Sequence, residues 1–103
     1  MKTPASAKRA NLPRAADYTK QFAKDWEGLS RSGCYNMRQL KEAMLLLIAN
    51  DAPLGAEWFD HPLKGEWADH RECHVGGDFL LIYRVVENRI VFVRAGTHAE
   101  LFE

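Results

Sequence analysis

The chain lacks any long uninterrupted run of apolar residues. Its longest run, over residues 43–49, has seven members, whereas a helix needs about 20 to cross a bilayer. Residues 1–9 are basic and rich in small side chains, but they lack the hydrophobic centre of a secretory signal. We therefore expect a cytoplasmic protein with no membrane-spanning segment.

Cysteine and glycine also do not form the sequence motifs in which they usually carry function. Two cysteines, Cys34 and Cys73, are too few for a disulfide framework in 103 residues, and we expect free thiols in a reducing compartment. The pair Gly76-Gly77 is too short to indicate a phosphate-binding loop. No serine lies in a nucleophile-elbow motif. Nucleotide cofactors and serine-hydrolase chemistry are therefore not indicated.

An excess of charge of one sign is missing too. The formal net charge is zero, which by itself argues against binding to nucleic acid. The charges are unevenly distributed, however: residues 1–41 carry a net charge of +6 and residues 42–103 a net charge of −6. Such asymmetry permits a basic contact surface without requiring one, because halves of a sequence need not become faces of a fold.

The length and composition are those of one small globular domain. At 103 residues, with 47% hydrophobic and 27% charged residues, the chain can bury a modest core. We expect a flexible basic tail over residues 1–10 and a single domain over residues 11–103. There is no internal repeat.

The first half of this domain has the pattern of a short strand and two helices. Residues 11–17 could form an edge strand, where Pro13 is tolerated. Thr19 is suited to cap a first helix, which ends at Ser32-Gly33 and has an apolar stripe made of Phe22, Trp26 and Leu29. Asn36 and Gln39 form a capping box for a second helix, whose buried face is Leu40, Met44, Leu47 and Ile48. Two helices so close in sequence predict an antiparallel hairpin.

The second half changes to the period of a β-strand. Residues 52–67 are interpreted as an ordered loop, and strands are expected over 71–75, 79–86 and 89–94. Turns are expected at residues 76–78 and 87–88, and Gly96 should break the third strand. We predict an α+β fold, in which a helix hairpin packs on one face of a small twisted antiparallel β-sheet.

Histidines are the main candidates for chemistry, and all four lie in the C-terminal half. In a meander, the end of the first strand, the start of the second and the end of the third meet at one rim. His74, Asp78, Phe79 and residues 94–98 should therefore converge there. Histidine suits proton transfer near neutral pH, although a lone histidine is more often a surface or core residue, so a purely structural role stays open.

A zinc site is the alternative for the same segment. His70, Cys73 and His74 are zinc-ligand types, with His61 or Asp69 as a further donor. Side chains alternate along a strand, so Cys73 should point away from His70 and His74. We therefore expect no metal ion and no cofactor.

Four segments together resemble a known family: Asp60-His61-Pro62-Leu63-Lys64-Gly65-Glu66-Trp67, Arg71-Glu72-Cys73-His74-Val75, Asp78-Phe79-Leu80-Leu81-Ile82-Tyr83, and Arg94-Ala95-Gly96-Thr97-His98-Ala99-Glu100-Leu101-Phe102. Their order and spacing resemble the YafQ branch of the RelE/ParE toxin superfamily over residues 60–102. A weaker similarity extends from about residue 17 through the second predicted helix. Residues 1–10 lie outside it.

The resemblance implies a toxin of a type II toxin–antitoxin pair with a fold like that of microbial ribonucleases. Such toxins enter the ribosomal A site and cleave the translated mRNA. The implied partners are an antitoxin, the ribosome and mRNA, with promoter DNA bound only by the toxin–antitoxin complex. The active-site positions implied by the family are His61, His74, Asp78, Phe79, Arg94, His98 and Phe102.

Each of these positions has an expected role in metal-independent RNA cleavage. His61 is expected to be the base for the 2′-OH and His98 the acid for the 5′-oxygen, with the reverse assignment open. His74 and Asp78 would support proton transfer. Arg94 would contact the phosphate, and Phe79 and Phe102 would stack on bases. Two other interpretations stay open: a gyrase-inhibiting toxin of the ParE type, and a non-catalytic binding module.

Overall fold

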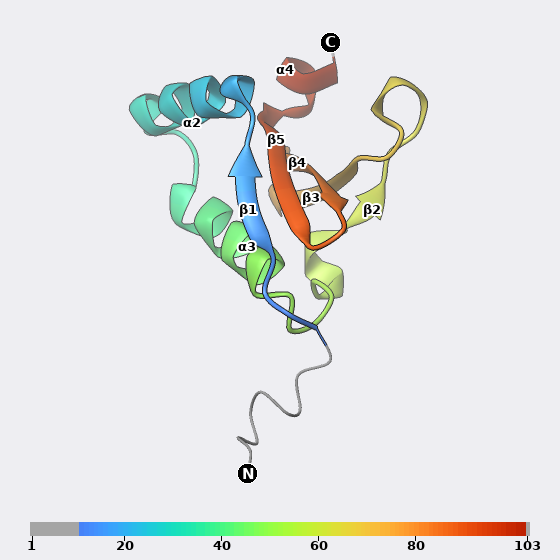
Figure 1. Cartoon of the computed structure of the whole chain (residues 1–103). Helices are drawn as coiled ribbons and strands as arrows, with labels where there is room; N and C mark the ends of the chain where they lie inside the picture. Colours follow the sequence, from blue (N-terminus) through green and yellow to red (C-terminus); the bar gives the residue numbers. More distant parts are fainter. Residues whose placement is uncertain (1–10, 103) are drawn as a thin grey trace.

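A five-stranded sheet forms the centre of the protein in a computed structural model that describes residues 11–102 (Figure 1). The strands are β1 (Ala15–Tyr18), β2 (His61–Pro62), β3 (Arg71–Gly76), β4 (Phe79–Val86) and β5 (Arg89–Thr97). Their order in the sheet is β1-β5-β4-β3-β2. The predicted meander of β3, β4 and β5 is confirmed. The edge strand β1 pairs with β5 in parallel, so the sheet is mixed and not purely antiparallel.

The two predicted helices begin and end where their capping residues indicate. In α2 (Lys20–Ser32), the Thr19 hydroxyl accepts a hydrogen bond from the Phe22 N–H at 2.9 Å. Gly33 ends this helix with a φ of 69°, a conformation that glycine adopts without a steric cost. In α3 (Met37–Ala49), the side chain of Asn36 accepts from the Gln39 N–H at 3.0 Å. Local capping chemistry therefore fixes both helices.

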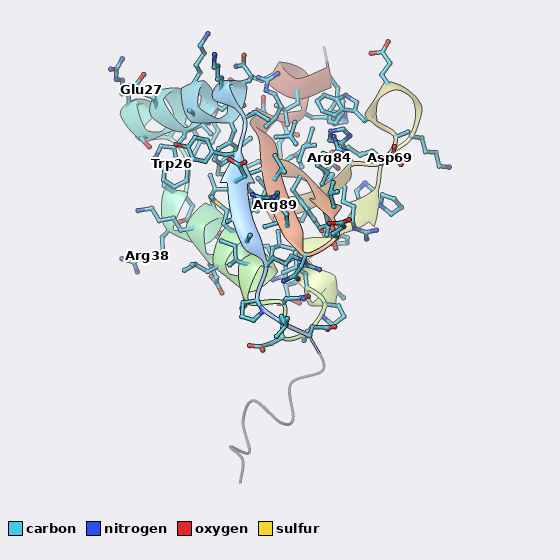
Figure 2. The ribbon with its side chains drawn as sticks, in the orientation of Figure 1. Trp26, Glu27, Arg38, Asp69, Arg84 and Arg89 are labelled. Atoms are coloured by element: carbon cyan, nitrogen blue, oxygen red, sulfur yellow. The ribbon has the colours of Figure 1, made fainter. Side chains whose placement is uncertain are left out.

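Both helices cover the same face of the sheet, but over different strands. α2 lies against β5, whereas α3 lies against β3, and the helices diverge from their connection in Figure 1. Trp26 of α2 points into the corner between them (Figure 2), where Lys41 of α3 lies 5.8 Å above its ring. The two helices therefore diverge and do not form the closely packed hairpin that the sequence predicted, because each helix packs its apolar stripe on the sheet. The main core between the layers includes Phe22, Leu40, Leu81, Tyr83 and Phe92.

The other face of the sheet carries a smaller core that the sequence did not predict. The short helix α4 (His98–Phe102) follows β5 directly, and Leu101 packs there against Leu80 and Ile82. The expected break at Gly96 is wrong, since β5 continues to Thr97. Gly96 instead permits the close approach of α4, because a Cβ atom there would lie 2.9 Å from the Glu100 carboxylate.

The segment expected to be a loop over residues 52–67 contains three short elements. These are the 3₁₀ turns η1 (Ala56–Trp58) and η2 (Gly65–Trp67), and strand β2, which pairs with β3. The connection through η2 projects beyond the sheet and carries Asp69 (Figure 2). The predicted basic tail over residues 1–10 lies outside the described residues. Within residues 11–102, no helix is long and apolar enough to cross a membrane.

Candidate functional site

Two of the predicted histidines meet where β2 pairs with β3. His61 is the register partner of Glu72, and His74 follows two residues later on the same face. Oε2 of Glu72 lies 3.3 Å from Nε2 of His61 and 3.5 Å from Nε2 of His74. Glu72 is only 6% exposed, so its carboxylate is held between the two rings. Glu72 was not predicted from the sequence, although strand alternation places it on the face of His74.

Phe59 holds both of these histidines from the preceding loop. Its carbonyl oxygen lies 2.7 Å from Nδ1 of His61, and its ring meets that of His74 edge-on at 5.5 Å. Phe59 has a φ of 48°, a left-handed conformation that is costly for an aromatic residue. Because a carbonyl and a carboxylate only accept hydrogen bonds, both contacts of His61 become hydrogen bonds when its ring is doubly protonated.

Asp78 and His98 meet at the rim, as the meander topology predicted. Phe79 pairs with Gly76 on one side and with Thr97 on the other, which brings the β3–β4 turn beside the start of α4. The backbone N–H of His98 donates to Oδ1 of Asp78 at 3.3 Å. The ring of Phe102 lies 4.9 Å from that of His98. Asp78 thus holds the start of the helix that carries His98.

Arg94 is bound by an acid that the sequence did not reveal. Its Nε and Nη2 atoms donate to the Asp25 carboxylate of α2 at 2.9 and 3.0 Å. The hydrogen bond to Asp25 is the main cause that raises the pKa of Arg94 above its usual range. The same carboxylate accepts from the Ala95 N–H at 3.1 Å. One edge of the guanidinium is therefore occupied, which leaves Nη1 for a further ligand.

The sheet register places Glu72 and His74 on the face of Leu80 and Ile82. The guanidinium of Arg94 is bound instead by Asp25 of α2, the helix that covers the opposite face. Glu72 pairs with Ile82, which pairs with Arg94, while His74 pairs with Leu80, which pairs with Gly96. Neighbouring strands are about 4.8 Å apart, so each row spans about 10 Å from β3 to β5. The buried side chains of Leu80 and Ile82 form an apolar floor between the His61–Glu72–His74 cluster and the residues of β5 and α4.

The aromatic residues expected to bind bases differ in their surroundings. Phe102 is half-buried and contacts His98, which fits such a role. Phe79 is 5% exposed and packs against Tyr35 at 5.1 Å, within the main core. Its ring has little free face for a base, so its geometry does not fit the expected stacking role.

The zinc ligand set considered from the sequence does not come together. Cys73 is fully buried in the main core, and burial raises the pKa of its thiol to about 12. The ring of His70 packs against Trp67 instead. A different set, His61, Glu72 and His74, places one ligand atom each within 4.8 Å of one another. Two imidazole nitrogens and a carboxylate oxygen are donors that suit a transition metal.

Comparisons with known proteins indicate the family to which the chain belongs. Residues 14–103 match the family model described as bacterial toxin of type II toxin–antitoxin system, YafQ. The mRNA interferase toxin YafQ of two Escherichia coli strains is 42% identical over 91 residues, which are 88% of this chain and 98% of the relative.

Comparison with solved structures indicates the same family. The crystal structure of YafQ from E. coli superposes with a TM-score of 0.81 at 41% identity, covering 87% of this chain and 99% of that one. In the E. coli DinJ–YafQ toxin–antitoxin complex, the matching chain has a TM-score of 0.80 at 41% identity, covering 89% of this chain and 100% of that one. A metal-bound toxin from Helicobacter pylori matches with a TM-score of 0.76 at 37% identity, covering 86% and 99%. The chain therefore belongs to the YafQ family of bacterial toxins from type II toxin–antitoxin systems.

Proposed function

We propose that this protein is an mRNA interferase, an endoribonuclease that cleaves translated mRNA in the ribosomal A site and is neutralised by an antitoxin encoded by an adjacent gene. Its E. coli relatives carry the name mRNA interferase toxin YafQ, and a YafQ from E. coli has been solved in a toxin–antitoxin complex with DinJ. The observation that supports the proposal most directly is the pair of contacts that Glu72 makes with His61 and His74. His98 contacts Phe102, which packs against the small core on the same face of the sheet.

Metal-independent cleavage needs a base for the 2′-OH and an acid for the departing 5′-oxygen. A histidine that takes the proton of the 2′-OH becomes an imidazolium ion, and a nearby carboxylate stabilises that ion. Glu72 therefore favours proton uptake by the histidines beside it. His98 is assigned to the second proton, with its backbone held by Asp78. In the reverse assignment, His98 would be the base and His61 the acid.

The remaining groups stabilise charge and position the substrate. The phosphorane formed on attack carries extra negative charge, which a guanidinium stabilises in the transition state. Nη1 of Arg94 lies outside the pair with Asp25 and serves this purpose. Phe102, beside His98, offers a ring on which a base can stack.

The test is single-turnover cleavage of ribosome-bound mRNA by His61→Gln and His98→Gln. Loss of one acid or base should slow cleavage by about 10²–10⁴-fold. Arg94→Gln should also be slow, whereas its matched control Arg89→Gln, at the exposed opposite end of β5, should cleave like wild type. If both histidine variants keep the wild-type rate, the assignment is wrong.

A modified substrate separates the acid from the base. A message with sulfur in place of the bridging 5′-oxygen has a leaving group that needs no proton. This substrate should restore cleavage by the variant that lacks the acid, but not by the variant that lacks the base. Rescue of His98→Gln supports the assignment given above, and rescue of His61→Gln supports the reverse. Residual cleavage of free RNA should be unchanged by EDTA if no metal ion takes part.

A further inference from the structure

A set of polar contacts that the proposed chemistry does not use surrounds Asp60, the residue that precedes His61. Oδ1 of Asp60 accepts a hydrogen bond from the Tyr83 hydroxyl at 2.6 Å. The same carboxylate accepts from Nε and Nη2 of Arg71, each at 3.4 Å. Tyr83 is 2% exposed and belongs to the main core, so these contacts lie on the face of the sheet that the helices cover.

Asp60 and His61 reach opposite faces of the sheet from neighbouring positions. His61 lies 3.3 Å from Glu72 on the face that carries the small core, whereas Asp60 binds Tyr83 in the main core. In the sheet, β3 lies between β2 and β4, so the hydrogen bond from Tyr83 to Asp60 passes over β3. A central strand thereby holds the backbone on which His61 is carried.

Strand β2 is too short to hold His61 by sheet pairing alone. It consists of His61 and Pro62, and proline has no N–H to donate to the neighbouring strand. On the other side of Asp60, Phe59 has a φ of 48°, a conformation that is costly for an aromatic residue. This segment therefore needs contacts from outside the strand pair, and Asp60 provides them.

The Tyr83 hydroxyl is difficult to replace as a partner of Asp60. The side chain of Asp60 is only 19% exposed, and a carboxylate in such a place is unfavourable without hydrogen bonds. Without the hydroxyl, Asp60 keeps the two longer contacts to Arg71, whose side chain is 41% exposed. A turn of Asp60 toward water would move Phe59 and His61, and the rings of both lie beside that of His74.

We propose that Asp60, held by Tyr83, is a positioning residue that keeps His61 beside Glu72 and His74. The inference rests on the proposed function, because the position of His61 matters for cleavage only if His61 transfers a proton. Asp60 and Tyr83 act through the backbone and touch no substrate. Their loss therefore slows the chemical step and leaves the binding of ribosome-bound mRNA unchanged.

Single-turnover cleavage of ribosome-bound mRNA tests the proposal with Tyr83→Phe, which removes one hydroxyl from the core. The rate at saturating toxin should fall about 10- to 100-fold, because a shift of about 1 Å near the chemistry has an effect of this size. The half-saturating toxin concentration should not change. Asp60→Ala should behave like Tyr83→Phe, whereas Asp60→Asn keeps an acceptor for the hydroxyl and should recover most of the rate.

The matched control is Ile90→Val, which removes one buried methyl group from the same core. It should lower the midpoint of thermal unfolding and leave both the rate and the half-saturating concentration at their wild-type values. A loss of stability is thereby separated from a loss of position.

A double-mutant cycle shows whether the effect passes through His61. In a protein that already carries His61→Gln, Tyr83→Phe should cause no further loss of rate, because the ring that it positions is absent. Together with His98→Gln, which alters a ring on α4, the two losses should multiply. A general structural defect would multiply with both histidine variants.

NMR spectroscopy measures the same geometry without cleavage. The ring centroids of His61 and His74 are 6.1 Å apart, as are those of Phe22 and Trp26 in the main core. Nuclear Overhauser effects between the two histidine rings should weaken in Tyr83→Phe. Those between Phe22 and Trp26 should persist, which also shows that the variant is folded.

The outcomes separate this inference from the cleavage proposal. If folded Tyr83→Phe keeps the wild-type rate and the contact between the histidine rings, the inference is overturned. It is also overturned if the loss multiplies with that of His61→Gln, or if it arises from weaker binding alone. If Tyr83→Phe does not fold, the comparison of Asp60→Ala with Asp60→Asn decides. If wild type does not cleave mRNA, the proposed function fails, and the NMR contacts still decide whether Asp60 positions His61.

Discussion

Buried or half-buried carboxylates hold the histidine and arginine side chains of this site in position. Glu72 lies between His61 and His74, and Asp25 holds Arg94. Removing a charge from water is costly unless it is paired and hydrogen-bonded, so each acid stays near its cationic or polar partners. At the scale of single residues, the acids orient the groups that are proposed to act on RNA.

Asp25 gives a direct test of this role. Asp25→Ala removes the acceptor of two guanidinium hydrogen bonds and of the Ala95 N–H. The free energy of unfolding should fall by about 1.5–3 kcal/mol, as for hydrogen bonds to charged groups, and cleavage should slow because Arg94 loses its position. Urea denaturation and the single-turnover assay measure the two effects.

The matched control for this variant is Asp17→Ala. Asp17 is exposed and lies 3.9 Å from Arg89, and an exposed pair contributes about 0–1 kcal/mol. Its loss should leave both stability and cleavage nearly unchanged. Equal effects of Asp17→Ala and Asp25→Ala would contradict a special role for the pair of Asp25 with Arg94.

At the scale of elements, α4 decides where His98 lies. A helix of five residues is not stable by itself, so other contacts must hold it. Leu101 is buried against the sheet, and Thr97 and Glu100 form a capping box. The Glu100 N–H donates to the Thr97 hydroxyl at 3.2 Å, and the Glu100 carboxylate accepts from the Thr97 N–H at 2.8 Å.

This capping box predicts a local effect on activity. Thr97→Ala should lower the local stability of α4 by about 1 kcal/mol, so that the short helix frays while the rest of the fold is kept. Thr97→Ser keeps the hydroxyl and should resemble wild type. Amide hydrogen exchange over residues 98–102 should be faster in the alanine variant alone, and its cleavage rate should fall while global unfolding changes little. Unchanged exchange in Thr97→Ala would refute this view of α4.

At the scale of the whole molecule, the main core determines how stability responds to alkaline pH. Cys73 and Tyr83 face the helices from β3 and β4 and are buried. Burial raises the pKa of the Cys73 thiol to about 12. It is also the main cause that raises the pKa of Tyr83 above its usual range, and the Tyr83 hydroxyl additionally donates to Asp60 at 2.6 Å. Both side chains therefore stay neutral in the folded protein at alkaline pH values at which they ionise in the unfolded chain.

The sign of the pH dependence follows from that difference. Between pH 9 and about 12, the unfolded chain loses the Cys73 proton while the folded protein keeps it, so stability falls as pH rises, by about 1.4 kcal/mol per pH unit for one proton. Below pH 9 this contribution is fully present. Cys73→Ala should give a flatter decline in the free energy of unfolding between pH 9 and 10.5, although it lowers stability at pH 7. Cys34→Ala, at an exposed position, should keep the wild-type slope.

The sequence by itself determined the parts of this protein that depend on neighbouring residues. Thr19, Gly33 and Asn36 specify where the helices begin or end, because capping is local chemistry. The period-2 pattern and short turns specify the β3–β4–β5 meander, and that topology brought Asp78 and His98 together at one rim. Strands joined by tight turns leave little choice of partner.

Only the tertiary structure decided which distant side chains complete the site. Asp25 and Arg94 are 69 residues apart, and no periodicity links a helix residue to a strand residue over that distance. The sequence also left open that Glu72 lies between two histidines, that Phe79 is buried with Tyr35, and that Trp67 adjoins Phe102. These contacts depend on how the layers pack and how α4 and η2 lie on the sheet, which is decided by burial of apolar surface from the whole chain.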